Sequence, residues 1–179
     1  MTAPVLLTGG TGTLGRPVLA LLRHAQRPVR VLSRQPHEPA DGVEYAIGDV
    51  STGAGLDAAM TGVETIIHCA GSAKGDAEKA RHLTQAAARA GVRHLVFVSV
   101  VGADRVPVIS GLDRAMFGYF AEKREAERIV AGSGVPWTTL RATQFHEWVL
   151  DLLQKLAALP VMPLWGGSRF QPVDSGEVA

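Results

Sequence analysis

A glycine-rich turn near the N-terminus constrains the fold of this chain more than any other feature. It follows the apolar run Val5 to Leu7 and places Gly9, Gly12 and Gly15 at intervals of three residues. Because glycine has no Cβ, these positions allow a tight turn out of a strand, a close approach of backbone to a pyrophosphate, and close packing of a helix on a sheet. The stretch therefore fits a phosphate-binding turn between a strand and a helix.

The segments that follow decide between two interpretations of these glycines. Glycine-rich turns are common, and an ordinary strand-to-helix turn would explain two of the three. Here a helical pattern is expected to open near Gly12, and a second apolar strand covers residues 29–32. The complete strand–helix–strand unit favours nucleotide binding, because the unpaired N–H groups and the positive end of the helix dipole would face the phosphates.

Apolar runs and helical patterns alternate along the rest of the chain. That alternation is typical of an α/β fold with a doubly wound parallel sheet. We expect strands at residues 5–7, 29–32, 43–47, 63–68, 94–98 and 135–141, and further helices at 56–60, 76–90, 119–131 and 144–159. Gly91 is expected to close the helix 76–90, and Asp174 or Ser175 to begin a last helix. Residues 103–118 are expected to form a loop, and residues 161–170 to be irregular or to form a short strand.

Size, charge and cysteine content limit the classes of function. A chain of 179 residues with 46% hydrophobic content can bury one sizeable core, and a net charge of +1 with mixed signs argues against a nucleic-acid partner. The single cysteine excludes an internal disulfide and suits a reducing compartment. No basic leader precedes the first apolar run, and no run approaches the ~18 residues of a membrane helix. We expect a cytoplasmic protein without a membrane partner or a metal site.

The end of the second strand bears on which dinucleotide is bound. A carboxylate here would hold the ribose 2′-hydroxyl of NAD and repel a 2′-phosphate, but the chain has Ser33 and Arg34. The Arg34 guanidinium can grip a phosphate through paired hydrogen bonds. An arginine at a strand end can also be merely solvated. The glycine turn upstream favours the phosphate interpretation and hence NADP(H), with NAD(H) as the alternative.

The ends of the third and fourth strands supply further cofactor-binding candidates. Asp49 and Val50 follow the third strand, and Cys69, Ala70 and Gly71 follow the fourth. Asp49 suits a hydrogen bond to the adenine amino group and equally a turn or a helix cap. The small residues after the fourth strand leave room for a cofactor. No histidine at a suitable spacing supports Cys69 as a nucleophile, so we interpret it as a packing residue that borders the cofactor.

Three side chains suit a reaction at the same edge of the sheet. Ser99 ends the fifth strand, and Tyr119 and Lys123 lie four residues apart, on one face of the predicted helix. A nearby ammonium favours the phenolate, so Lys123 is expected to lower the pKa of Tyr119 from its ordinary value near ~10. Such a pair also occurs by chance in many helices. Ser99 at the sheet edge and the nucleotide-binding turn favour a catalytic set.

Taken in order, these motifs resemble the atypical short-chain dehydrogenases/reductases of the NmrA-like, NAD(P)-binding kind. The resemblance rests on residues 8–15 (TGGTGTLG), 91–99 (GVRHLVFVS), the Tyr119 and Lys123 pair, and 140–146 (LRATQFH), and it covers essentially the whole chain. It implies a Rossmann-type sheet in the order 3-2-1-4-5-6. It also implies that the turn binds the dinucleotide through Thr8, Gly9, Gly12, Thr13, Leu14 and Gly15, and that Arg34 meets the NADP phosphate.

The resemblance further implies roles in catalysis. Ser99 matches the substrate-orienting serine, and Tyr119 and Lys123 match the catalytic pair, with Lys123 also holding the nicotinamide ribose. We therefore expect an NADP(H)-dependent oxidoreductase acting on a carbonyl, quinone or alcohol, a small-molecule substrate, as a monomer or a homodimer. Some NmrA-like proteins bind NADP without turning anything over. The alternative function is therefore that of a redox-sensing regulator.

The chain departs from the pattern of this family in two respects. Residues 109–118 lengthen the segment between Ser99 and Tyr119. Relatives also continue well beyond residues 170–174 into a C-terminal substrate-binding portion. We therefore expect a dinucleotide-binding domain at residues 1–159, with residues 160–179 as the start of an incomplete C-terminal portion.

Overall fold

Six parallel strands form one sheet at the centre of the molecule. The computed structural model describes residues 2–38, 40, 42–72, 74–161 and 171–179. In these residues the strand order is β3-β2-β1-β4-β5-β6, as predicted. The strands are β1 (Val5–Thr8), β2 (Val29–Ser33), β3 (Val43–Ile47), β4 (Thr65–His68), β5 (His94–Val100) and β6 (Trp137–Ala142).

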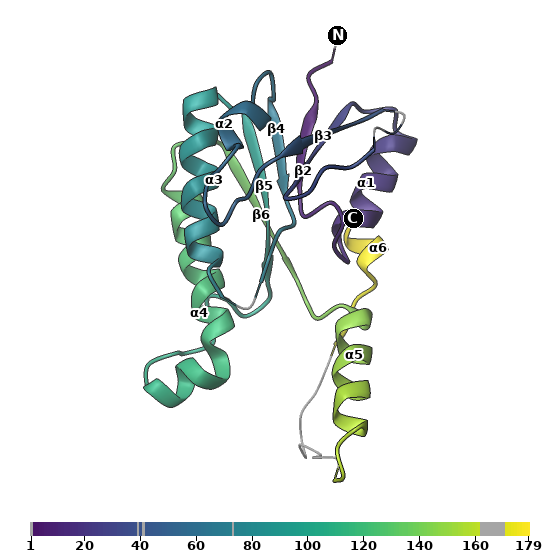
Figure 1. Ribbon diagram of the computed structural model, residues 1–179. Helices are drawn as coiled ribbons and strands as arrows, with labels where there is room; N and C mark the ends of the chain where they lie inside the picture. The colour runs from purple at the N-terminus through teal and green to yellow at the C-terminus, as the bar shows by residue number, and fades with distance from the viewer. Residues whose placement is uncertain (1, 39, 41, 73, 162–170) are drawn as a thin grey trace.

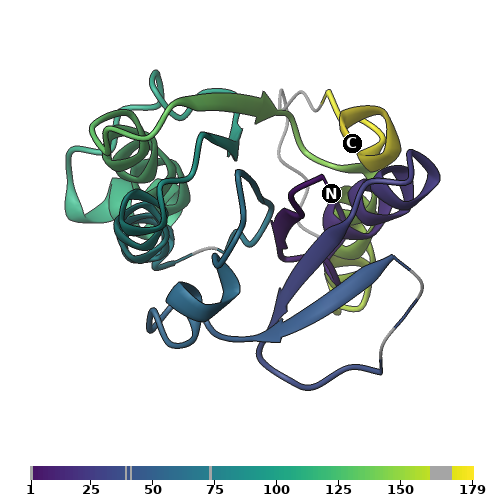
Figure 2. The same cartoon turned by 90° about the horizontal axis from the view of Figure 1, so that it is seen from above.

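Helices cover both faces of the sheet. One face carries α2 (Leu56–Ala59), α3 (Asp76–Ala90) and α4 (Gly111–Ala131), and the other carries α1 (Gly15–His24) and α6 (Ser175–Val178) (Figure 1). Figure 2 shows the α3–α4 layer and the α1–α6 layer on opposite sides of the strands. The helix α5 (His146–Ala157) extends away from the sheet, beyond the carboxyl ends of the strands.

The order of the strands creates the place where a ligand can bind. After β3 the chain crosses back over β1 to form β4, so β1 pairs with both β2 and β4. The chain leaves β1 toward one face of the sheet and leaves β4 toward the other. A crevice therefore forms between the carboxyl ends of these two strands, and ligands of open α/β sheets bind in such a crevice. Thr8 pairs with Leu32 on one side and with His68 on the other, so it marks this crevice on β1.

Two apolar clusters flank the sheet and fix the helices to it. Alternate residues of each strand point to opposite faces, so Leu6 and Leu7 of β1 belong to different clusters. The larger cluster joins the sheet to α2, α3 and α4 through buried residues such as Leu83, Phe97 and Val130. The smaller cluster joins it to α1. The almost continuous apolar character of the strands follows from burial on both faces.

Several predicted boundaries are confirmed. The helix α3 spans the predicted residues, and its C-cap Gly91 has φ +69°, a left-handed conformation that favours glycine. Asp174 caps α6, because its side chain accepts from the backbone N–H groups of Gly176 and Glu177. The ends of the strands and of α2 and α5 shift by one or two residues. Of the segment 161–170, residues 162–170 lie outside the described part, so that expectation is not tested there.

The start of α4 was predicted wrongly. Residues 103–118 were expected to form a loop, but the helix begins at Gly111 and runs for 21 residues. Ser110 and Asp113 explain the difference with a capping box. The Asp113 N–H donates to Ser110 Oγ (3.1 Å), and the Ser110 N–H donates to Asp113 Oδ2 (2.8 Å). Local capping thus starts a helix in a stretch whose apolar pattern is weak.

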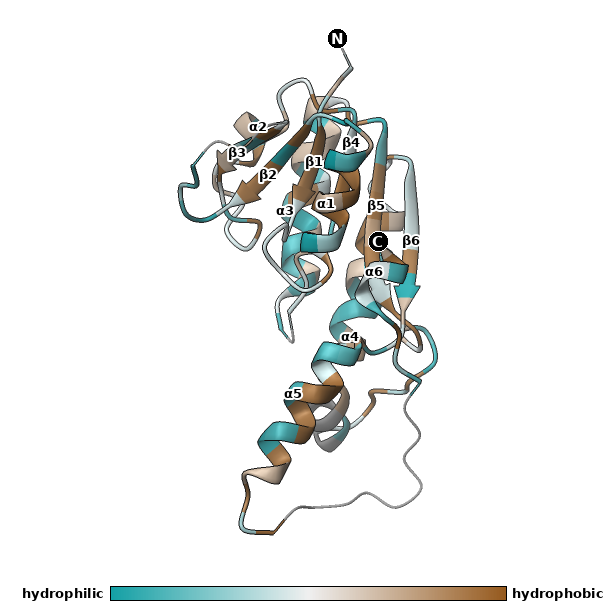
Figure 3. Cartoon of the chain, turned by 90° about the vertical axis from the view of Figure 1, so that its right-hand side faces the viewer, coloured by the Kyte–Doolittle hydropathy of each residue, from teal (hydrophilic) through white to brown (hydrophobic). Residues whose placement is uncertain are grey.

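The helix α5 has the predicted amphipathic pattern but buries none of its residues. Brown, hydrophobic positions alternate with teal, hydrophilic ones along α5 in Figure 3. Trp148, Leu150 and Leu153 are exposed. Residues 171–179 return to the main body, where Val173 pairs with Phe145 and Val178 packs against the smaller cluster. The division of the chain at residue 159 stays a prediction. None of the described helices is both long and apolar enough to cross a membrane.

Candidate functional site

A crevice of about 930 Å³ opens at the carboxyl ends of β1, β2, β3 and β4. Its lining comes from the glycine turn, the end of β2 and the loops after β3 and β4. The lining residues are 8–9, 11, 16, 32–35, 37, 48–51, 70–72, 74–75 and 78–79. Eight predicted cofactor-binding residues are among them: Thr8, Gly9, Ser33, Arg34, Asp49, Val50, Ala70 and Gly71. Segments far apart in the sequence thus meet at the place that the strand order dictates.

The glycines of the turn have separate structural reasons. Gly9 has φ +73°, and a Cβ there would lie 2.7 Å from the backbone N of Ala70. A Cβ on Gly15 would lie 1.9 Å from the carbonyl oxygen of Gly9, so this glycine lets α1 pack on the turn itself. Gly10, in the turn itself, lies close to β2, since a Cβ there would lie 2.9 Å from Val31 Cγ1.

Gly12 leaves open space beside the turn. Among the described residues, a Cβ on Gly12 would meet just the Gly9 carbonyl oxygen, at 3.3 Å. Exposed Thr13 follows it, and the side chain of Leu14 is buried in the smaller cluster. The crevice lining does not include residues 12–15. A ligand would therefore reach Leu14 through its backbone alone.

The first turn of α1 is free of acidic groups and of a side-chain cap. Its N-cap is Leu14, so α1 begins three residues later than predicted. The guanidinium of Arg16 donates to the carbonyl oxygen of Thr11 (2.8 Å) and lines the crevice. Arg16 was not predicted as a site residue, although a basic residue directly after the third glycine was a usable signal. The end of α1 at the crevice is therefore electropositive.

The end of β2 presents a hydroxyl and a guanidinium to the crevice. Ser33 Oγ lies 2.8 Å from His37 Nε2 and accepts from the Gln35 N–H (3.2 Å). Arg34 is exposed, and no carboxylate in the described part of the chain pairs with it. Its charge is therefore available to an anionic ligand.

Asp49 fulfils one of its two predicted roles. Its Oδ1 accepts from the Ser51 N–H (2.8 Å), which closes the turn after β3, and its side chain also lines the crevice. It does not cap α2, whose N-cap is Gly55. The adenine contact stays a prediction.

Cys69 packs beside the crevice and does not line it. Burial, partly offset by the Lys123 ammonium, raises the pKa of its thiol to about 12. The group is therefore a thiol at neutral pH, as the packing interpretation requires.

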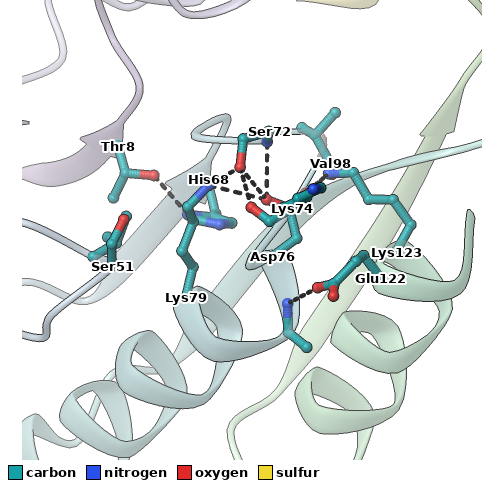
Figure 4. Close-up of polar contacts among 12 residues, drawn as sticks. Thr8, Ser51, His68, Ser72, Lys74, Asp76, Lys79, Val98, Glu122 and Lys123 are labelled. Carbon is teal, nitrogen blue, oxygen red and sulfur yellow. Dashed lines mark hydrogen bonds and ion pairs between the residues drawn. The ribbon is translucent and has the colours of Figure 1, made fainter. Parts of the chain in front are cut away.

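Lys123 reaches the edge of the crevice from α4. Its side chain is buried, and its ammonium pairs with Asp76 Oδ2 (2.9 Å) and donates to the carbonyl oxygen of Val98 (3.1 Å), next to Ser99 (Figure 4). A Cβ on Gly71 would lie 3.0 Å from Nζ, so the ammonium borders the backbone that lines the crevice. Asp76 was not predicted as a site residue from the sequence.

Tyr119 and Ser99 flank this lysine. The Tyr119 ring centroid lies 5.9 Å from Lys123 Nζ, and Tyr119 is 38% exposed. Ser99 is buried, and its Oγ has no hydrogen-bond partner among the described residues. Neither side chain lines the crevice. The α4 helix and the end of β5 therefore bring the three predicted catalytic residues to one side of the cofactor crevice.

The predicted direction of the Tyr119 pKa is wrong. Burial first, and then the negative charge of Asp76, raise the pKa of Tyr119 above its ordinary value. The physical reasons are that burial disfavours the phenolate and that the Asp76 carboxylate, paired with Lys123, adds a negative charge beside the ammonium that was expected to lower the pKa. Tyr119 is therefore a neutral phenol at physiological pH. No group of His, Cys, Asp or Glu in the described residues is arranged to hold a metal ion.

Comparisons with known proteins agree with this geometry. A family model described as NAD(P)H-binding matches residues 9–149. A (4-alkanoyl-5-oxo-2,5-dihydrofuran-3-yl)methyl phosphate reductase of Streptomyces griseus is 33% identical over 98% of this chain and 60% of its own length. An NADPH-dependent quinone oxidoreductase of Escherichia coli, solved with NADPH, is 28% identical, with a TM-score of 0.72 over 85% of this chain and 53% of its own.

A third similar protein shares the fold at lower identity. The triphenylmethane reductase of Citrobacter sp., solved with NADP(H), is 20% identical, with a TM-score of 0.77 over 98% of this chain and 62% of its own. The chain therefore spans between half and two thirds of the length of these three proteins.

Proposed function

The chain belongs to the NAD(P)H-binding family of atypical, NmrA-like short-chain dehydrogenases/reductases, and we propose that it is an NADP(H)-dependent oxidoreductase acting on a carbonyl, quinone or alcohol. One observation carries the proposal. The Lys123 ammonium, one helical turn from Tyr119, lies against Gly71 at the edge of the crevice that the glycine turn begins. The reductases and the quinone oxidoreductase that the chain resembles support this reaction class.

The residues of the crevice fit a dinucleotide phosphate. The open space at Gly12 and the uncapped start of α1 suit a pyrophosphate. Arg34 and Ser33 would hold the 2′-phosphate, and Arg16 adds a second guanidinium to the same crevice. These groups support a preference for NADP(H), with NAD(H) as the weaker ligand.

The proposed catalytic residues have separate tasks. NADPH, when bound, supplies the hydride. Tyr119 donates its phenolic proton to the substrate oxygen as negative charge develops there, and the buried Ser99 hydroxyl hydrogen-bonds the same oxygen. Lys123 holds the ribose next to the nicotinamide. The raised pKa of Tyr119 keeps its proton available, which suits reduction of a substrate.

A second candidate function is that of a non-catalytic NADP-binding redox sensor. The pairing of Lys123 with Asp76 favours it, because an ammonium so neutralised holds a ribose without activating Tyr119. In this function Tyr119 and Lys123 would do no more than bind the cofactor.

Replacing Tyr119 by phenylalanine tests the two functions against each other. We expect Tyr119→Phe to slow NADPH oxidation by roughly 10² to 10⁴-fold, since a positioned general acid is lost, and to leave NADPH affinity nearly unchanged. NADPH consumption with a panel of quinones and carbonyl compounds gives the rate, and calorimetry gives the affinity. Tyr45→Phe is the matched control, because Tyr45 is the other tyrosine of the chain and does not line the crevice. Turnover at the parental rate in Tyr119→Phe would remove Tyr119 from the mechanism.

A further inference from the structure

Asp76, the first residue of α3, has a buried carboxylate to which the proposed mechanism assigns no task. It is 2% exposed, although a carboxylate is costly to bury without partners. Figure 4 shows it between the loop that precedes α3 and the side chain of Lys123 from α4. Its position next to a predicted catalytic residue raises the question of what it does there.

The two oxygens of Asp76 serve different parts of the molecule. Oδ1 accepts from the Ser72 N–H (2.9 Å) and pairs with the ammonium of Lys79 (3.1 Å), and both of these residues line the crevice. Oδ2 pairs with Lys123 Nζ at 2.9 Å. The carboxylate thus connects the rim of the crevice to the lysine on α4.

Asp76 supplies the counter-charge of a buried lysine. Lys123 is 5% exposed, and its ammonium lies 5.3 Å from the centroid of the Phe97 ring. Leaving a buried charge without a partner is strongly destabilising. The neighbouring carbonyl of Val98 is a dipole and not a counter-charge. The Asp76 carboxylate is the negative charge in contact with Nζ in the described residues.

The same geometry places the Lys123 ammonium beside the backbone that lines the crevice. An ammonium has three N–H donors; Nζ donates to the Val98 carbonyl oxygen and forms an ion pair with Asp76. The nearby Gly71 lines the crevice, and a Cβ there would come within 3.0 Å of Nζ. A hydroxyl of a ligand in the crevice can therefore approach the ammonium because residue 71 has no side chain.

We propose that Asp76 is the positioning residue of Lys123: its carboxylate is the counter-charge of the buried ammonium and holds it beside Gly71, where the ammonium donates to a ribose hydroxyl of the dinucleotide. This inference rests on the proposed function for the identity of its ligand. Burial by itself would raise the pKa of Asp76, but Lys123, Lys79 and Ser72 lower it below its ordinary value, so the carboxylate is charged at neutral pH.

The competing explanation is that Asp76 only stabilises the packing of α3 and α4. A second carboxylate near the start of α3, that of Glu122, provides the control. Glu122 Oε2 accepts from the Ala77 N–H (3.3 Å) and so also joins α4 to the start of α3. In the described residues its carboxylate forms no ion pair with the ammonium of Lys123, whose partner is Asp76. Glu122→Gln and Asp76→Asn make the same chemical change at neighbouring positions. Loss of helix packing alone would give the two variants similar behaviour.

The ammonium of Lys123 can be observed directly. A buried, paired lysine ammonium exchanges its protons slowly, so ¹⁵N–¹H spectra of the cofactor-free protein at neutral pH are expected to show its signal, assigned by loss in Lys123→Arg. We expect Asp76→Asn to abolish the signal and Glu122→Gln to retain it. In the parent protein, NADPH is expected to shift it. A signal that survives in Asp76→Asn overturns the proposal. A signal that NADPH does not shift in the parent protein also overturns it, and this second experiment requires no variant of Asp76.

Cofactor binding then shows whether Asp76 acts through Lys123. We expect Asp76→Asn and Lys123→Met each to weaken NADPH binding by about 10-fold, and the double variant to be no weaker than either single variant, because residues that act as one unit are not additive. Glu122→Gln is expected to bind as the parent does. If the fold-losses of NADPH affinity of the two single variants multiply in the double variant, Asp76 acts independently of Lys123, through the loop before α3, and the proposal is overturned.

Failure of this inference differs from failure of the proposed function. A chain that binds no NADPH by calorimetry contradicts the proposed function and, with it, the ligand named here. If the Asp76→Asn variant binds NADPH as tightly as the parent protein does, the role proposed for Asp76 is wrong and the proposed function still stands.

Discussion

Single residues at the end of β2 are the basis of the proposed preference for NADP(H). Arg34 is exposed at the crevice beside Ser33, and these two residues stand where a carboxylate would hold the ribose of NAD. A guanidinium gains charge-assisted hydrogen bonds to a 2′-phosphate, and the 2′-hydroxyl of NAD offers no such charge.

We therefore expect Arg34→Ala to weaken NADP(H) binding by about 10- to 100-fold, the equivalent of about 1.5–3 kcal/mol for hydrogen bonds to a charged group. NAD(H) binding should change little. Calorimetric titration of both cofactors measures the difference, and Arg27→Ala is a control with the same loss of charge at the opposite end of β2. Equal binding of both cofactors by the parent, with no effect of Arg34→Ala, would show the assignment to be wrong.

His68 determines part of the response to acid. It is buried at the end of β4, with its Nδ1 2.7 Å from Thr8 Oγ1. Burial, and then the charge of Lys123, lower its pKa to about 3. The unfolded chain binds a proton at His68 below pH ~6.5 and the folded chain does not, so the free energy of unfolding falls as the pH falls from there. The pKa of Asp76 is lowered in the folded protein, so its contribution to the free energy of unfolding is lost only as the pH falls below the ordinary carboxyl pKa of ~3.9. That loss lies below the pH range in which His68 acts.

We expect His68→Asn, which keeps a hydrogen-bonding group near Thr8, to reduce the loss of stability between pH 6.5 and 5. The slope of the free energy of unfolding against pH should be smaller in the variant than in the parent by up to ~1.4 kcal/mol per pH unit, the contribution of one such group. Urea unfolding of parent and variant at three pH values in this range gives the two slopes. Identical slopes would mean that His68 titrates normally in the folded protein.

At the scale of elements, α4 is the helix that carries the site. Its capping box at Ser110 and Asp113 sets its start, and Tyr119 and Lys123 follow two to three turns later. Gly118 lies inside the helix, and a Cβ there would meet none of the described residues within 4 Å. The cap and the glycine therefore affect helix stability in opposite directions.

We expect Ser110→Ala to lower the free energy of unfolding by about 0.5–2 kcal/mol, because the N-cap bond is lost. Gly118→Ala should raise it by about 0.5–1 kcal/mol, because alanine has less conformational freedom in the unfolded chain. Denaturant unfolding measures both. If residues 111–118 formed the loop predicted from the apolar pattern, neither change would have these signs.

At the scale of the whole molecule, the crevice is lined by segments from both sides of β1 in the sheet. Residues from β1, β2 and the loops after β3 and β4 line it, and the two apolar clusters lie on either side of the same strands. A ligand that contacts all these segments stabilises the folded state, because it binds the native chain and not the unfolded one.

We expect NADPH at 100 times its dissociation constant to stabilise the protein by about 2.7 kcal/mol. Gly12→Val should abolish this effect while the sheet stays folded, since a branched side chain would fill the open space beside the turn. Thermal unfolding with and without NADPH, and circular dichroism of the variant, test both statements. A variant that NADPH still stabilises would place the nucleotide elsewhere.

Local signals in the sequence determined the elements, and the family resemblance predicted the order of the strands in the sheet. The period of the apolar residues identifies every strand of the sheet, and the glycine turn places the crevice at the end of β1. The helix α3 was predicted to the residue because its start and its C-cap Gly91 are local features. The start of α4 had an equally local signal in Ser110 and Asp113, so that error reflects the weight given to periodicity.

The chemistry of the site depends on contacts between distant residues, which only the tertiary structure decided. Asp76 and Lys123 are 47 positions apart, and no spacing rule connects a residue of α3 with one of α4. The pKa of Tyr119 was therefore predicted in the wrong direction, because the sequence showed the neighbouring ammonium but neither the burial of the phenol nor the Asp76 carboxylate beside that ammonium. Periodicity and capping act within a few residues along the chain, so the sequence by itself determined the elements and their order. Charge and burial act through space, so the state of each buried group followed from the packing of α3 and α4 on the sheet.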